Sequence, residues 1–115
     1  MATVSSHTLD GATGKHAGGI EVRLLNLTSG KQLFKVTTSQ EGRLNESIDV
    51  DESESTDRYE LIFETTEYWN SQKLGNTQSI KEIVLRFSIP DAKARYHCSI
   101  ILSPNSYSTW ASLPE

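Results

Sequence analysis

Two of the three histidines and one arginine in this 115-residue chain have the types and spacing that favour chemistry. His7 and His97 each lie in a strand-like segment, and Arg43 directly follows the turn-forming pair Glu41-Gly42. An imidazole changes its charge near neutral pH, so one ring can activate water while another protonates a leaving nitrogen. A guanidinium can hold planar oxygen atoms through two hydrogen bonds. Two histidines and one arginine therefore suit the hydrolysis of an anionic ring.

Simpler interpretations exist for the same residue types. A single strand histidine is more often a surface or hydrogen-bonded residue than a catalyst, and His16, in a glycine-rich loop, is expected to be solvated. The histidine spacing matches no paired-ligand zinc motif, so we expect no metal and no other cofactor. The acidic stretch 49–54 lacks the glycine and terminal glutamate of a calcium loop and is expected to be solvated.

Alternating apolar residues predict the strands that position these side chains. The expected strands cover residues 20–24, 33–38, 59–64, 83–89 and 96–102, with a hairpin turn at Ser29-Gly30. One short helix is expected over residues 65–73, capped by Thr65 or Thr66. In the last strand the single cysteine, Cys98, is expected in the core. His97 then lies on the outer face with Ile101, which suggests that another subunit covers this face.

Several short strands separated by polar turns predict an all-β fold, an antiparallel β-sandwich with one short helix. The length fits one domain over residues 1–115. A net charge of -4 and a pI near 5.3 argue against nucleic acid as a partner. No apolar run approaches the roughly 20 residues of a membrane helix, so no membrane association is expected.

The two ends of the chain predict a cytoplasmic location. Residues 1–7 lack the basic start and apolar run of a secretory signal. The peroxisome is the alternative compartment, although Leu113-Pro114-Glu115 is not a peroxisomal targeting tripeptide.

Short motifs across the whole chain resemble those of the transthyretin-like 5-hydroxyisourate hydrolases. Residues 6–10 and 19–24 resemble the family's His-x-Leu-Asp start and first long strand, and Glu41-Gly42-Arg43 is similar to its Asp-Gly-Arg turn. Tyr96-His97 and residues 102–109 resemble the family's closing signature. The resemblance implies a transthyretin (prealbumin)-like sandwich that assembles as a homotetramer, a dimer of dimers, with active sites at the dimer–dimer interface.

The resemblance also implies catalytic positions at His7, Arg43 and His97. The implied reaction opens the lactam ring of a small-molecule substrate, 5-hydroxyisourate, in urate breakdown and needs no cofactor. A histidine-activated water would attack the ring carbonyl while Arg43 stabilises the developing negative charge, and the two histidines could exchange roles.

The C-terminal segment departs from the family pattern, which ends in Tyr-Arg-Gly-Ser. Trp110 falls on the tyrosine position and is expected to keep an aromatic wall, and Ser112 stands in for the terminal serine. We therefore predict that Trp110 and Ser112 bind substrate. Ala111 takes the arginine position, which is expected to remove a charged donor from the pocket, and His16 stands where the family usually has proline.

Two other functions stay open from the sequence. One is a non-catalytic transthyretin-like protein that binds a small aromatic ligand or a protein in the channel between subunits. Transthyretin itself does not keep the histidine pair, so His7 and His97 favour the enzyme. The other is a structural sandwich that binds a protein through a sheet edge, which predicts that the two histidines lie far apart.

Overall fold

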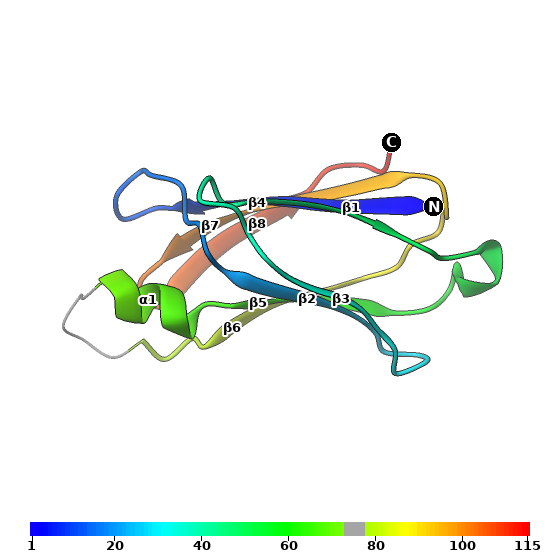
Figure 1. Ribbon diagram of the computed structural model, residues 1–115, viewed down its shortest axis with the longest axis horizontal. Coiled ribbons are helices and arrows are strands. Elements are labelled where there is room, and N and C mark those ends of the chain that lie inside the picture. The colour runs from blue at the N-terminus through cyan, green and yellow to red at the C-terminus, as the bar shows by residue number, and fades with distance from the viewer. Residues whose placement is uncertain (73–77) are drawn as a thin grey trace.

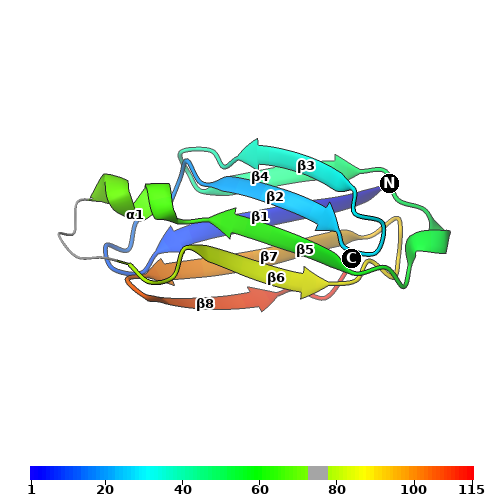
Figure 2. The same cartoon turned by 90° about the horizontal axis from the view of Figure 1, so that it is seen from below.

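Two four-stranded β-sheets pack face to face in this computed structural model, which describes residues 1–72 and 78–115 (Figure 1). Sheet A has the strand order β4-β1-β7-β8, and sheet B has the order β3-β2-β5-β6. The strands are β1 (Ala2–Asp10), β2 (Glu21–Asn26), β3 (Gln32–Thr37), β4 (Arg43–Ile48), β5 (Tyr59–Glu64), β6 (Glu82–Phe87), β7 (Arg95–Ser103) and β8 (Ser106–Ala111). The helix α1 (Thr66–Gln72) follows β5 and lies at one end of the sandwich (Figure 2).

The predicted β-sandwich is confirmed, and the alternating pattern explains its core. Six inward apolar residues of β2, β5 and β7 are at most 1% exposed; they are Val22, Leu24, Leu61, Phe63, Ile100 and Leu102. Each such side chain contributes about 1.5–3 kcal/mol when it is fully removed from water. The strand pairs are antiparallel except for β1 and β7, which run parallel. This parallel pair brings the first strand of the chain beside the segment that carries His97.

The hairpin between β2 and β3 forms as predicted, with Gly30 at a φ of +80°. The helix is also present, and the predicted last residue, Lys73, lies outside the described residues. Thr65 takes the predicted N-cap position, where its carbonyl accepts the Trp69 N–H at 3.1 Å, while the hydroxyls of Thr65 and Thr66 both donate to the carbonyl of Lys81. A carboxylate oxygen of Glu64 also accepts the Thr66 N–H, at 3.0 Å. The two threonines therefore tie the start of the helix to the segment before β6.

The acidic stretch forms a solvated loop, as the sequence indicated. Glu52–Glu54 makes a single 3₁₀ turn, which the Asp51 side chain caps by accepting the Ser53 N–H. Within residues 1–72 and 78–115, no three His, Cys, Asp or Glu side chains converge as a metal site requires. The described helices are all too short or too polar to span a bilayer.

Two glycines allow the backbone contacts that place Arg43. Gly42 has a φ of +74°, and a Cβ atom there would collide with the carbonyl oxygen of Thr8. A Cβ atom on Gly18 would collide with the carbonyl of Gln40. Loop 11–19 and the turn before β4 therefore approach each other closely at the end of β1, where Arg43 begins its strand.

Candidate active site

The outward face of sheet A carries all three predicted catalytic residues. The strand register aligns one row of side chains across β4, β1, β7 and β8: Arg43, His7, Ser99 and Trp110. The next row on the same face consists of Asn45, Ser5 and His97. Ser112 extends this second row, since its N–H donates to the His97 carbonyl at 2.9 Å. Neighbouring strands lie about 4.8 Å apart and the rows roughly 6–7 Å apart, so His7 and His97, which lie on adjacent strands and in neighbouring rows, are within reach of one small substrate.

Serine hydroxyls hold both ring nitrogens of His97. The Oγ atom of Ser5 lies 2.8 Å from Nδ1, and the Oγ atom of Ser99 lies 3.3 Å from Nε2. A hydroxyl can donate or accept, so these contacts fix the ring plane in either tautomer. The sequence reasoning did not identify either serine as a site residue. Their signal was present, because Ser5 precedes His7 by two residues and Ser99 follows His97 by two, which places each on the same face.

The ring of His7 contacts the third histidine. Its Nε2 atom lies 3.0 Å from Nδ1 of His16. His16 is exposed, as predicted, but its contact with a site residue was not foreseen. The ring centroids are 5.1 Å apart and the planes are tilted by 49°.

The environment lowers the pKa of both predicted catalytic histidines from the ordinary value of 6.5. For His7 the largest cause is desolvation, followed by the positive charges of Arg43 and His16, and a hydrogen bond to the Glu41 backbone opposes the shift. For His97, desolvation again lowers the pKa most, and Arg43 and Arg95 lower it further. Both rings are therefore neutral near pH 7 and able to accept a proton.

A cavity of about 350 Å³ opens between Arg43 and His97 on this face. Ser5, Asn45 and Arg95 also line it. In the described part of the chain neither arginine forms an ion pair with a carboxylate. Two uncompensated guanidinium groups favour a ligand rich in oxygen or negative charge, although the whole chain is acidic. Arg95 and Asn45 were not predicted as site residues.

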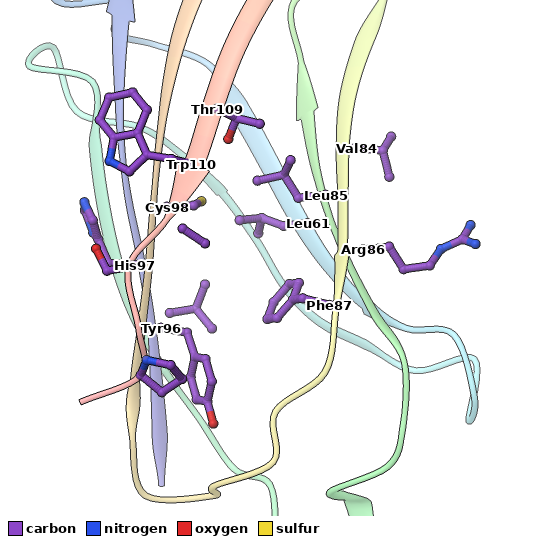
Figure 3. A pocket seen from close by; sticks show the side chains of 14 residues that line it. Leu61, Val84, Leu85, Arg86, Phe87, Tyr96, His97, Cys98, Thr109 and Trp110 are labelled. Carbon is purple, nitrogen blue, oxygen red and sulfur yellow. The ribbon is translucent and has the colours of Figure 1, made fainter.

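The C-terminal segment contributes side chains to both faces of sheet A (Figure 3). Trp110 pairs with Ser99, lies on the same side of the sheet as His97 and is 52% exposed. Ala111 pairs with Cys98, which is buried and faces the opposite sheet as predicted. The register therefore places position 111 on the inner face, away from the histidines. The expectation that Ala111 removes a donor from their pocket is not supported by this register.

A second cavity, of about 500 Å³, lies between the edges of the two sheets. Figure 3 shows Cys98 and Thr109 pointing toward Leu61, Leu85 and Phe87 across this space. Trp110 and Ser112 also border this cavity, and so does His97, so both predicted substrate-binding residues and one predicted catalytic histidine reach it.

A sandwich of two four-stranded sheets, with two histidines and an arginine on one outer face, defines a transthyretin-like protein with a polar surface site. Residues 4–111 match the model of the HIUase/Transthyretin family, and the chain belongs to this family.

Similar proteins agree with this assignment over nearly their whole length. The chain is 33% identical over 111 residues to 5-hydroxyisourate hydrolase 2 of Rhizobium meliloti, covering 93% of this chain and 92% of that protein. The structure of Klebsiella pneumoniae 5-hydroxyisourate hydrolase superposes with a TM-score of 0.79 at 25% identity, covering 98% of this chain and 100% of that one. Sea bream transthyretin shares the fold, with a TM-score of 0.78 at 24% identity over 96% of this chain and 94% of that one.

Proposed function

We propose that this protein hydrolyses the lactam ring of 5-hydroxyisourate in urate catabolism. The observation that carries the proposal is that Arg43 lies beside His7 in one row of the outward face of sheet A, while His97 lies in the next row and borders the same cavity as Arg43. One cation and two neutral bases therefore meet on one face, which is the set of groups that cofactor-free hydrolysis of an anionic ring requires. Relatives named 5-hydroxyisourate hydrolase, such as the Rhizobium meliloti protein, support the substrate.

The proposed reaction begins when one of the two histidines accepts a proton from water. The water oxygen forms a bond to the ring carbonyl carbon, and the carbonyl oxygen takes up the displaced electron pair. Arg43 stabilises that negative charge. When the carbonyl re-forms, the carbon–nitrogen bond breaks and the nitrogen takes the proton from an imidazolium. The product is the ring-opened carboxylic acid, and the free bases are restored.

Binding of the substrate is proposed to use the same face. Arg43 and Arg95 would contact the substrate's oxygens from one side of the 350 Å³ cavity. Trp110, in the row of His7, would stack on the planar ring, and Ser112 would contribute its hydroxyl beside His97.

The proposal is tested by the decay of freshly generated 5-hydroxyisourate, followed by ultraviolet absorbance and corrected for the spontaneous reaction. The parent protein is expected to accelerate the decay. His7→Asn and His97→Asn are each expected to reduce this acceleration by about 100-fold or more, since each removes a proton-transfer group. Lys35→Gln is a matched control, because Lys35 is an exposed cation of sheet B. Parent activity that survives both histidine substitutions would contradict the proposed mechanism.

We further propose that the protein is a homotetramer, a dimer of dimers, with its sites between subunits. Half-buried Leu9 and Ile101 lie on the outward face of sheet A beside the histidines, together with the exposed Trp110. Apolar side chains of this size on a face with an open polar cavity favour coverage by a second copy. Sedimentation at micromolar concentration measures the assembly, and a monomer would contradict an interfacial site.

A second candidate function is binding of a small aromatic molecule without catalysis. The apolar cavity of about 500 Å³ between the sheet edges favours it, because its volume suits such a ligand. A folded tetramer that does not accelerate 5-hydroxyisourate decay would support this alternative over the hydrolase.

A further inference from the structure

Loop 11–19 folds back along β1 and pairs with the end of this strand through a single β-bridge. His16 pairs with Leu9 in an antiparallel bridge. The backbone on either side is fixed, since the Asp10 N–H donates to the Lys15 carbonyl at 2.8 Å and the Ala17 N–H donates to the Thr8 carbonyl at 3.0 Å. Paired residues project from the same face of a sheet, so His16 lies on the face of Leu9 and of His7.

We propose that His16 is a positioning residue for His7, which fixes the plane of the His7 ring and connects it to solvent through a shared proton. The proposal rests on the hydrolase function, because it assigns His16 to the proton transfers of that reaction. Its basis is the distance of 3.0 Å between Nε2 of His7 and Nδ1 of His16.

A hydrogen bond between two imidazoles requires an N–H on one ring and a lone pair on the other. The pair keeps this bond when it is neutral, and also when it carries one additional proton. With a second additional proton two N–H groups would face each other, and the contact would break. His7 is half-buried and His16 is exposed, so a proton received by His7 has a direct route to solvent through His16.

Other charged groups around the pair determine how it titrates. Arg43 and His97 face His7 from β4 and β7, and both lower its pKa, as does His16, whereas a hydrogen bond to the Glu41 backbone raises it. His16 also borders a cavity of about 390 Å³ together with Lys15 and Tyr68. Among the described residues that lower the pKa of His7, His16 is the one that also contacts a ring nitrogen of His7.

The experiment compares the parent protein with His16→Leu and His16→Gln. Leucine fills similar space without a polar atom, and glutamine keeps a hydrogen-bonding group without a titratable charge. Lys15→Ala is the matched control, because it removes an adjacent exposed cation from the same loop. Two readouts are used: titration of the His7 ring protons by NMR, and the pH profile of kcat/KM.

In His16→Leu, the His7 titration is expected to move to higher pH because a neighbouring positive charge is lost. The acid limb of kcat/KM moves with it, so activity falls several-fold more near pH 6 than near pH 8. His16→Gln is expected to restore most of kcat near pH 8, because the hydrogen bond is kept, but not the position of the acid limb. Lys15→Ala is expected to leave both readouts close to the parent.

The NMR titration needs no substrate, so it separates the two proposals. A parent protein that does not accelerate decay overturns the hydrolase function and with it the catalytic part of this inference. In an active parent, an unmoved His7 titration and a parallel pH profile in His16→Leu overturn the role of His16.

Discussion

The outward faces of the two sheets have similar strand geometry but differ in how their cationic side chains are paired. On sheet B, cations lie beside carboxylates, with Arg86 2.6 Å from Glu60 and Arg23 3.5 Å from Glu82. On sheet A, Arg43 forms no ion pair with a carboxylate among the described residues. Its positive charge instead lowers the pKa of His7 and of His97.

This difference explains why one face is a candidate site and the other is a solvated surface. Exposed ion pairs each contribute about 0.2–1 kcal/mol and neutralise one another's field. An unpaired guanidinium keeps its field, which lowers the pKa of His7 and His97 and attracts oxygen-rich ligands. Reactivity in this sandwich therefore depends on which charges lack a partner more than on the fold.

The largest effect is expected when the positive charge of Arg43 is removed from sheet A. Arg43→Met is expected to lower kcat by about 100- to 1000-fold, the usual cost of losing a donor that stabilises developing negative charge. Because Arg43 lowers the pKa of both histidines, the acid limb of the pH–rate profile should also move to higher pH. Steady-state kinetics across pH measures both effects. An unchanged acid limb would contradict the electrostatic role.

A smaller effect is expected from Ser5→Ala, which removes the hydroxyl at Nδ1 of His97. Loss of one such hydrogen bond is worth about 1 kcal/mol, so kcat should fall roughly five- to tenfold while KM changes little. Ser47→Ala is the control, since Ser47 is exposed on β4 next to Thr3 and away from both histidines. Equal kinetics for the two variants would show that Ser5 does not orient the ring.

The lowered histidine pKa values also predict how stability depends on pH. As the pH falls, His7 and His97 gain their protons at a higher pH in the unfolded chain than in the folded chain. The free energy of unfolding should therefore decrease as the pH falls from about 7 through the lowered folded-state pKa values. Denaturant unfolding at several pH values measures this slope. The double variant His7→Asn/His97→Asn should have a shallower slope, and an identical slope would refute the assignment.

The smallest effect is expected from a substitution on sheet B. Arg23→Gln removes one member of an exposed ion pair, so the free energy of unfolding should change by less than about 1 kcal/mol. The rate of 5-hydroxyisourate decay should equal that of the parent. A marked loss of activity would mean that the two faces are coupled and that the contrast drawn between them is too simple.

Strands with an apolar pattern in their sequence could be predicted, and strands without that pattern could not. Residues 59–64 and 96–102 were located correctly because their inward positions are apolar and fully buried. β8 was missed as a strand, since all six of its residues are exposed and its serines and threonine give no apolar period. For β4 the sequence indicated the start at Arg43, but its pairing with β1 had no local signal.

Local sequence patterns were enough to predict the sandwich class and the position of His97 opposite the buried Cys98. These follow from local periodicity, which neighbouring residues encode. The folded chain was needed to show that Ser5 contacts the ring of His97, 92 residues further along the chain, and that His16 contacts His7. Both contacts depend on strand register and loop packing. The alternating pattern of one strand says which face a residue occupies, but not which residue lies beside it on the next strand.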